Sequence, residues 1–521
     1  MLYPSVIRSR RSCVSASEAL RETLWACESP GVKAVLGALV CSGCSLLYNP
    51  SNISPAVDAS PDAEIILDAD PTQLRLEKVS PAVFFEGRGS DGGRPALLVV
   101  HGEHIVPGAV ISIAVHGGGT VPTASVGTTE VAANGRMAAA PVVLAVDPTL
   151  AAGQTIRIDV TVTQPGPSTP ITATIASASP SEDVPVLSIT GLDELEGVDV
   201  ALPTGVHEYS RVAITGTLTA SDTAQPLIIR AQASIAVASA SVSAAGLGSG
   251  PNGHNGGAGG SGVLGAPGLA GGGPGGGTAS GGGGGFAAKG ADGAAVNTGG
   301  AMSGFASIPT FALPNRSSGG AGGNGGLLGA QGGAGGGGGG TLELTAGGTV
   351  MVGTLESKGG DGTTAASTLG GGGSGGVILV RSGAAIEATA IDVSGGNGDG
   401  IGSVGRIRTD GANVPTTTPA AYRGPTLAAD TPVITRNPAP MLTLFGERLK
   451  TFSYFVSDEN SSNIHGPFDV TTSGASQNSF AIDEPLFRGL NTICVLVEQA
   501  VLVEEKPEAR NCIELVYLYT P

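Results

Sequence analysis

Three histidines lie close together in the sequence and are the first candidates for metal chemistry. His101 and His104 are three residues apart in HGEH, and His116 follows in the next apolar run. A zinc site needs ligands that converge and a second shell that orients them. HGEH lacks the HExxH spacing, and positions i and i+3 of a strand face opposite sides of a sheet. We therefore expect surface or turn histidines and no bound metal.

A second candidate cation site is GGNGDGIGS, which begins at Gly395. It is similar to the calcium-binding nonapeptide GGxGxDxUx, in which tandem repeats supply the ligands. Here the aspartate, Asp399, stands one place early, and no tandem series accompanies it. The sequence therefore predicts no calcium site at this position.

Carboxylates and basic residues could support carbohydrate cleavage. A polysaccharide lyase combines an arginine or lysine base with carboxylates that hold calcium, and a glycosidase needs two carboxylates a fixed distance apart. Arg230 and Arg381 occupy or flank equivalent positions of the repeat described below, which indicates a solvated face. The candidates are few and form no local cluster in the sequence: Glu343, Glu356, Glu387 and Asp392, with Arg230, Lys358 and Arg381.

Nucleotides, nucleic acids and other cofactors are not expected as ligands. GFAAKGA lacks the GK[ST] ending of a phosphate-binding loop, and GxGxxG look-alikes arise by chance among 87 glycines in 521 residues. The net charge of −17 opposes binding to a phosphate backbone. A GxSxG nucleophile elbow needs a strand-to-helix turn, and no helical pattern follows residue 50.

The N-terminal region has the order of an export signal. VKAVLGALVCSGC contains Lys33, a short apolar core and small residues that end at Cys44. The Ser-Gly-Cys end resembles the lipobox of bacterial lipoproteins, although Cys41 replaces the usual leucine. The resemblance implies acylation of Cys44 and an exported protein anchored in a membrane, at the outer membrane or cell surface. Residues 1–44 form this region, and because residues 1–31 fit no signal, we expect the true start near residue 32.

Two further predictions concern the chain after Cys44. Residues 45–73 are rich in proline, aspartate, alanine and serine, which predicts a disordered tether. Cys494 and Cys512 are the cysteines that remain, and two cysteines in an exported chain indicate one disulfide.

The elements that must position these residues are strands, because the apolar residues are mostly small or β-branched. Short apolar runs separated by glycine, proline or asparagine turns predict a β-sandwich at residues 74–165. Within it, VSPAVFFEGRGSDGGRPALLVVHGEHIVPGAVISI resembles the opening of IPT/TIG immunoglobulin-like domains. The resemblance implies a binding or spacer module without catalysis.

Residues 184–411 contain an internal repeat. PLIIRAQASIAVASASVSAAG, TLELTAGGTVMVGTLESKGG and VILVRSGAAIEATAIDVSGG each read as a strand, a break, a strand and a glycine exit. Such short units must stack to bury one face, which predicts a right-handed parallel β-helix. The stretch resembles surface proteins with glycine-rich parallel β-helices. The apolar positions superpose in four sets: Leu227, Leu342 and Ile378; Ile229, Leu344 and Val380; Ile235, Val350 and Ile386; Val237, Val352 and Ala388.

Glycine tracts follow Gly246, Gly359 and Gly395, at the same corner of each unit. The longest, an insertion at residues 247–339, has glycine at every third position from 253 to 271. Proline is too rare there for collagen, but a period of three suits extended polyproline-II segments lying side by side. We expect an elaborated corner of the β-helix, partly ordered or wholly flexible.

Five strand-like runs predict a C-terminal β-sandwich at residues 425–521. The whole chain is therefore expected to be all-β. Its patterns favour a non-catalytic cell-surface lipoprotein with a structural or adhesive role, which contacts a membrane through its lipid and a polysaccharide or protein through flat β surfaces. The alternative is a pectate-lyase-like enzyme or a polysaccharide-binding protein that uses the β-helix face.

Overall fold

Strands, turns and extended segments make up the described residues of the computed structural model. No helix occurs among them, so the all-β prediction is confirmed. They all lie within the unit Pro71–Pro521. The predicted signal and nearly all of the tether lie outside them. The described ranges are 73–85, 95–115, 124–144, 155–175, 186–188, 194–246, 248–253, 283–285, 287, 290–291, 333–365, 368–429, 433–459, 463–474, 477–496 and 510–519.

Two sheets form the first unit, and they pack around buried residues such as Leu98, Val100 and Val160. Its strands are β1 (Arg75–Ser80), β2 (Val83–Phe85), β3 (Ala96–Glu103), β4 (Val110–Val115), β5 (Ala124–Val126), β6 (Glu130–Val131), β7 (Met137–Leu144), β8 (Thr155–Gln164), β9 (Ile171–Ile175) and β10 (Val186–Ser188). One sheet has the order β1-β3-β7-β5, with β6 on β7. The other has the order β2-β10-β8-β4, with β9 on β8.

The first unit continues past residue 165, where the sequence placed its end. Both β9 and β10 pair with β8, so they complete the second sheet of this unit. The range 184–411 assigned to stacked units therefore includes one strand, β10, that belongs to the preceding unit.

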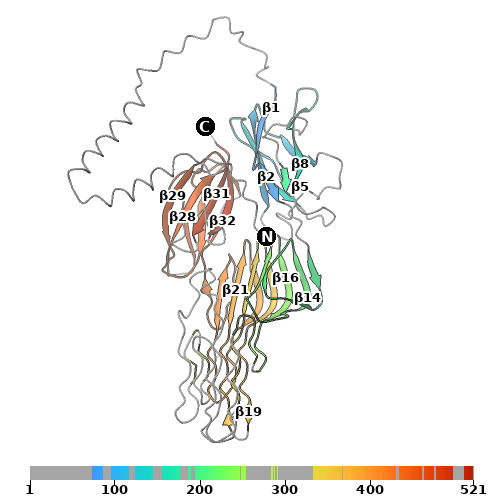
Figure 1. The fold of residues 1–521 in the computed structure, drawn as a ribbon. Helices are drawn as coiled ribbons and strands as arrows, with labels where there is room; N and C mark the ends of the chain where they lie inside the picture. The colour runs from blue at the N-terminus through green and yellow to red at the C-terminus, as the bar shows by residue number, and fades with distance from the viewer. Residues whose placement is uncertain are drawn as a thin grey trace, which may run out of the picture. The chain divides into compact units, whose positions relative to one another are not determined.

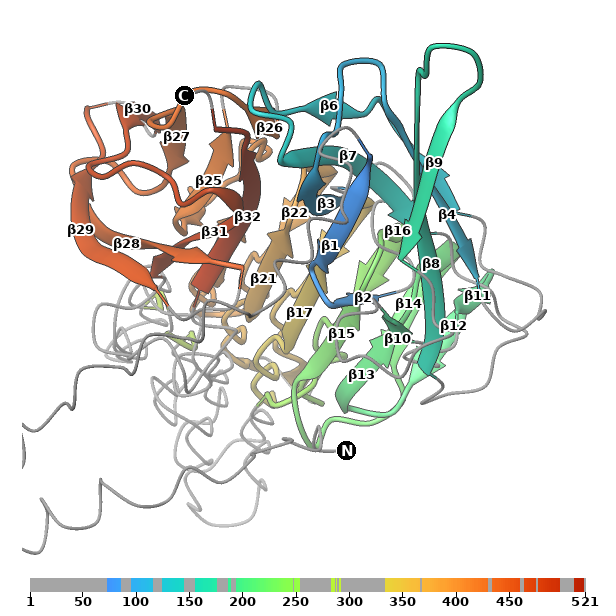
Figure 2. The same ribbon diagram turned by 90° about the horizontal axis from the view of Figure 1, so that it is seen from above.

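Two parallel sheets of stacked strands form the middle unit. The first parallel sheet comprises β11 (Leu195–Gly197), β12 (Val200–Leu202), β14 (Val212–Ala220), β16 (Ile235–Ser241), β18 (Val350–Glu356) and β22 (Ile386–Asp392). The second comprises β13 (Gly205–Tyr209), β15 (Leu227–Ala231), β17 (Thr341–Ala346), β21 (Val377–Ser382), β23 (Arg406–Asp410) and β24 (Tyr422–Arg423). Figure 2 shows β13, β15, β17 and β21 side by side in that order.

The register of these sheets is the one that the repeat alignment predicts. Leu227 pairs with Leu342 and Leu342 with Ile378, while Val350 pairs with Ile235 and Ile386. The inward-facing members form one continuous apolar core between the sheets. Each unit thus contributes one strand to each sheet, and burial is shared between neighbouring units.

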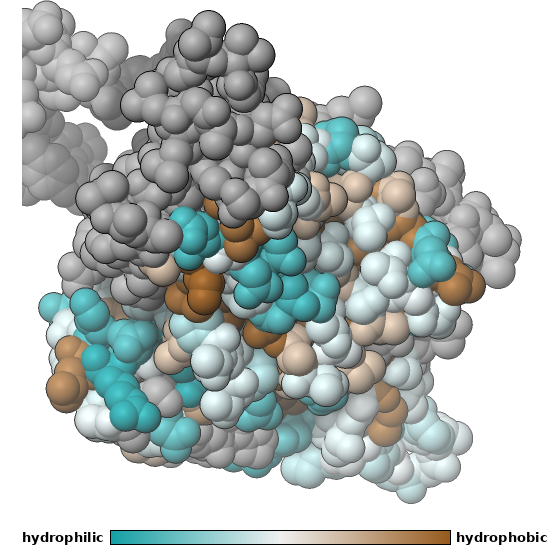
Figure 3. All heavy atoms as spheres, turned by 90° about the horizontal axis from the view of Figure 1, so that it is seen from below, coloured by the Kyte–Doolittle hydropathy of each residue, from teal (hydrophilic) through white to brown (hydrophobic). Residues whose placement is uncertain are grey.

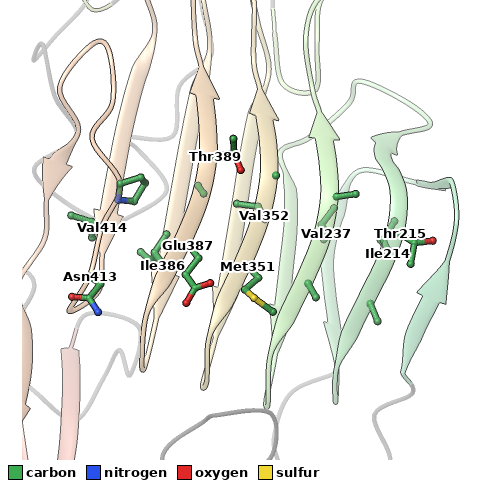
Figure 4. A pocket seen from close by; sticks show the side chains of 16 residues that line it. Ile214, Thr215, Val237, Met351, Val352, Ile386, Glu387, Thr389, Asn413 and Val414 are labelled. Carbon is green, nitrogen blue, oxygen red and sulfur yellow. The ribbon is translucent and has the colours of Figure 1, made fainter.

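Alternation is interrupted within the strands of the first parallel sheet, where the sequence predicted a regular inner face. The residues buried in β16 are the first, third and sixth: Ile235, Val237 and Ala240. The fourth and fifth residues therefore both lie on the outer side. The same spacing of core residues occurs in β18, at Val350, Val352 and Leu355. This interruption gives the strands a bend, which is visible in Figure 4.

Glycine segments continue the stack beyond the strands, toward the hairpin of β19 (Thr364–Ala365) and β20 (Thr368–Leu369) (Figure 1). We call the described residues 242–253, 333–340, 357–363, 370–376 and 392–405 the glycine array. The N–H groups of Gly336 and Gly339 donate to the carbonyls of Gly371 and Ser374, both at 2.9 Å. Two more segment pairs repeat this spacing: Gly359 and Gly362 donate to Ser394 and Asn397, and Gly372 and Gly375 donate to Gly400 and Ser403.

Donors at every third residue match the period of polyproline II, and the close approach explains why glycine is required. A Cβ on Gly360 would lie 2.2 Å from the carbonyl oxygen of Gly246, and one on Gly396 would lie 2.0 Å from that of Gly360. The three predicted exits thus stack on one another. The described glycines at 248–253 and 333–339 of the insertion belong to this packed array, and Gly284 donates to the carbonyl of Gly372 within it at 2.8 Å.

Two sheets also form the C-terminal unit. Its strands are β25 (Thr426–Ala429), β26 (Ile434–Thr435), β27 (Met441–Phe445), β28 (Thr451–Asp458), β29 (Ile464–Thr471), β30 (Gln477–Ala481), β31 (Gly489–Leu496) and β32 (Arg510–Tyr517). The sheet orders are β25-β27-β30 and β26-β32-β31-β28-β29. All five runs read as strands in the sequence are strands here, and they enclose a core that includes Tyr454 and Leu515.

The first and C-terminal units share a small apolar cluster. Leu97 and Val99 of β3 pack with Leu490, Val516 and Leu518 of the C-terminal unit. Ion pairs lie beside this cluster: Lys78 and His101 both contact Glu459, and Arg436 lies 3.3 Å from Glu130.

Candidate functional site

The predicted covalent sites are described only in part. Cys494 on β31 stands directly opposite Cys512 on β32, and the two form a disulfide, as the sequence predicted. Cys494 is buried, whereas Cys512 is exposed. The predicted lipidation site, Cys44, lies outside the described residues.

The histidine pair of HGEH does not converge. The Nε2 atom of His101, in β3, lies 3.4 Å from the carboxylate of Glu459. His104 is exposed in a turn, with φ of 58°, and His116 lies outside the described residues. In the described part of the chain, no three His, Cys, Asp or Glu side chains gather so that they could hold a metal ion.

The nonapeptide-like stretch at Gly395 is part of the glycine array. The N–H of Gly396 donates to the carbonyl of Gly373, and that of Asp399 donates to the carbonyl of Gly370. Its backbone therefore joins neighbouring glycine segments.

Three of the scattered charged residues do converge, which corrects the expectation that they form no cluster. Glu356 and Asp392 are register partners on β18 and β22. The ammonium of Lys358 lies 2.8 Å from the Glu356 carboxylate and 3.1 Å from that of Asp392. Glu356 and Lys358 line a hollow of about 450 Å³ beside the glycine array, together with Asp361 and Asn397.

In this cluster one ammonium group forms ion pairs with two carboxylates. Hydrogen bonds to Glu356 and Asp392 raise the pKa of Lys358, so the amine stays protonated at neutral pH. Burial of the Asp392 carboxyl opposes its ionisation, but hydrogen bonds from Ser394 and Lys358 outweigh burial and lower its pKa. A general base must be unprotonated and a general acid protonated near the working pH. Lys358 is protonated and Asp392 is ionised, so Lys358 cannot act as the base and Asp392 cannot act as the acid.

The other basic candidates also have structural partners. The Nε atom of Arg230 lies 4.0 Å from the carboxylate of Glu343, which is only 1% exposed. The Nε of Arg381 donates to Asn511 of the C-terminal unit at 2.7 Å. Arg381 therefore lies at a contact between units, whereas the sequence had placed it on a solvated face.

A trough with a volume of about 610 Å³ lies on the outer side of the first parallel sheet. It follows the bend of each strand and crosses four strands, from β14 to β22 (Figure 4). One row of side chains across it is set by the register of the sheet: Ala213, Ala236, Met351 and Glu387. The trough is thus a repeated feature, contributed in turn by each unit of the stack.

Small and apolar residues form the floor of the trough, and polar groups lie around it. Ala238 and Gly353 have little or no side chain and leave space at the centre, while Met351 is 49% exposed. Thr215, Thr389 and Asn413 bring hydroxyl and amide groups to it. Glu387 is its single ionisable side chain, and Figure 4 shows it beside Met351 on the neighbouring strand. Such a lining suits an elongated ligand with apolar faces and hydrogen-bonding edges.

Sequence reasoning missed the trough, although a signal was present. Small or hydroxyl residues fill the two consecutive outward positions of each unit: Ala238 and Ser239, Gly353 and Thr354, Thr389 and Ala390. Two such residues inside a strand pattern, repeated at one place in every unit, could have indicated the bend.

Comparisons with known proteins give no assignment. No family model, no curated protein and no solved structure matches the chain. The described part of the chain contains no helix with the length and hydropathy of a membrane span.

Proposed function

We propose that this chain is a non-catalytic adhesive protein of a cell surface, exported and anchored through a lipid on Cys44. In this proposal the first unit is an immunoglobulin-like sandwich of the IPT/TIG kind. The middle unit is a right-handed parallel β-helix with glycine-rich corners, and a β-sandwich closes the chain. The parallel, in-register pairing of β15, β17 and β21 supports the β-helix assignment.

The observation that carries the proposal is the contrast between the trough and the charged cluster. The cluster of Glu356, Lys358 and Asp392 has acids and a base in one place, but the lysine is held in its protonated form by ion pairs with both carboxylates. The trough is long and mainly apolar, with a single carboxylate, Glu387. Acid–base cleavage needs at least a matched acid and base, so binding is the better use of this surface.

An extended polysaccharide is the ligand class that we propose for the trough. Sugar rings have apolar C–H faces and hydroxyl edges, which complement a floor of Ala238 and Met351 and the polar groups of Thr389 and Asn413. Among the described residues on the face shown in Figure 3, hydrophobic residues are scattered among polar ones and form no broad apolar patch.

A glycan array with the intact protein tests this function. Ala238→Trp should fill the trough and abolish binding to the glycans that the wild type retains. Ala114→Trp, at an exposed position of β4, is the matched control and should bind normally. Release of oligosaccharide products from a bound glycan would establish the enzymatic alternative. Unchanged binding by Ala238→Trp would remove the trough from the proposal.

Membrane anchoring has a separate test. Metabolic labelling with a palmitate analogue should mark the wild-type protein and not Cys44→Ala. Labelling that persists in this variant would refute acylation at Cys44, whatever the glycan array shows.

A further inference from the structure

The second parallel sheet extends two strands beyond the last strand pair that the two sheets share, β21 and β22. β21 is followed in its sheet by β23 and β24, whereas β22 pairs with no strand besides β18 among the residues that the structure describes. The returning chain makes a single bridge, Ala385 to Asn413, and the N–H of Ile386 donates to the carbonyl of Asn413 at 3.0 Å. Pro415 follows two residues later and has no N–H, so it cannot extend the ladder.

Asn413, Val414 and Pro415 line the trough together with Ile386 and Glu387, so within the described part of the chain the open edge of β22 begins at Ala388. Because backbone N–H groups alternate in direction along a strand, that of Ala388 faces the same side as that of Ile386. Ala388 is also partly exposed, although its register partner Val352 is buried. An edge with free backbone groups is a template for adding a further strand.

Negative charge gathers along this edge. The Glu387 side chain is exposed and makes no ion pair or hydrogen bond with the described residues. Farther along β22, Asp392 shares the ammonium of Lys358 with Glu356. The three carboxylates and one ammonium leave a net charge of −2 on this part of the sheet. Opposite charges on adjacent strands stabilise their pairing, and like charges oppose it.

We propose that β22 is a docking edge for an extended basic segment of another protein, which adds a strand to the first parallel sheet. Backbone hydrogen bonds to Ala388 supply the attachment, and a Lys or Arg within reach of the Glu387 carboxylate selects the partner. A second copy of this chain would bring its own acidic β22 edge, so it lacks the complementary charge. This inference does not depend on the glycan proposed for the trough.

Fluorescence anisotropy with the full chain and a labelled synthetic peptide, acetyl-TVKVTVK-amide, tests the proposal. The basic peptide should bind saturably, and the acidic peptide acetyl-TVEVTVE-amide should not. Glu387→Lys should weaken binding of the basic peptide by about five- to tenfold and allow the acidic peptide to bind. Glu77→Lys, at an exposed position of β1, is the matched control and should change neither affinity.

Hydrogen exchange separates strand addition from simple charge attraction. Bound peptide should slow exchange at Ala388, and Ala388→Pro, which removes this N–H, should abolish peptide binding. If Ala388→Pro fails to fold, protection of Ala388 in the wild-type protein with bound peptide still tests strand addition. Peptide binding without protection at Ala388, or an unchanged affinity in Glu387→Lys, would overturn the proposal.

A concentration-dependent dimer with a protected β22 would assign the edge to a second copy instead. Ala238→Trp should still bind the peptide, so failure of the glycan proposal is distinguishable.

Discussion

The ammonium of Lys358 lies 3.1 Å from the carboxylate of Asp392, which belongs to the next unit of the stack. The same ammonium contacts Glu356 at 2.8 Å, so one cation joins two neighbouring strands at the corner where the glycine array begins. This contact links the charge pattern to the stacking of the units, and it gives stability a defined dependence on pH.

The first prediction concerns that dependence. The pKa of Asp392 is lowered from 3.8, so its contribution is present above pH 3.8 and is lost as pH falls through the folded value. The pKa of Lys358 is raised above 10.5, so its contribution is lost as pH rises through the folded value. Urea unfolding should be measured for wild type and Lys358→Gln at about pH 3, about pH 7 and about pH 11. Between about pH 7 and either extreme, the free energy of unfolding should fall less in Lys358→Gln than in wild type. Lys450→Gln, an exposed lysine of the C-terminal unit, should keep the wild-type profile.

Packing of the glycine array is tested by two neighbouring substitutions. A Cβ on Gly250 would lie 2.1 Å from the carbonyl oxygen of Val242, whereas one on Gly248 would have its nearest contact at 3.4 Å. Gly250→Ala should therefore lower the free energy of unfolding by about 2 kcal/mol, because overpacking forces the backbone apart. Gly248→Ala should stay within about 0.5 kcal/mol of wild type. Equal effects of the two substitutions in denaturant titrations would contradict the packed arrangement.

The contact between the first and C-terminal units predicts a second acid-sensitive element. Burial of Glu459 would raise its pKa, but interactions with His101, Lys78 and Ser80 lower it from 4.5 to about 2. The stabilisation is therefore present above pH 4.5 and disappears as pH falls toward about 2. Glu459→Gln should cost about 1–3 kcal/mol at neutral pH, because its partners stay partly buried. Limited proteolysis should then cleave within or beside these two units sooner than in wild type, because their mutual contact is weakened. Glu77→Gln, at an exposed position of β1, should leave the proteolysis rate unchanged.

Removal of the disulfide should destabilise the C-terminal unit alone. Cys494 and Cys512 are separated by 18 residues, for which loop closure predicts about 3 kcal/mol. The double variant Cys494→Ala, Cys512→Ala should unfold this unit at lower denaturant, as followed by the fluorescence of its tyrosines. Protection of β16 and β18 in hydrogen exchange should not change. Loss of protection there would mean that the units unfold as one.

Much of the fold follows from one feature of the sequence, the superposition of apolar residues. Leu342 and Ile378 have the same place in two units, and stacking them is the way to bury both, so the register could be predicted before the structure. The same alignment also superposes Glu356 and Asp392, which are direct partners. The ion-pair cluster could thus have been found by carrying the alignment from apolar to charged positions.

Other features depend on contacts that no local pattern encodes. His101 and Glu459 lie in different units and are 358 positions apart, and the strand runs around them contain no common motif. The bend that forms the trough replaces strict alternation by an inward spacing of three, from Val237 to Ala240. A reading based on period two cannot generate that spacing, so it missed the surface that the bend creates.

The glycine array has a thermodynamic consequence. Gly337, Gly360 and Gly373 are linked by backbone hydrogen bonds and carry no side chains. Unfolding this region exposes mainly peptide groups, whose hydration lowers the heat capacity, whereas exposed apolar surface raises it. Hydrophobic burial weakens on cooling, but an array held by peptide hydrogen bonds does not share that weakness. The corners of the stack should therefore keep their strength in the cold, where the apolar core between the sheets begins to lose it.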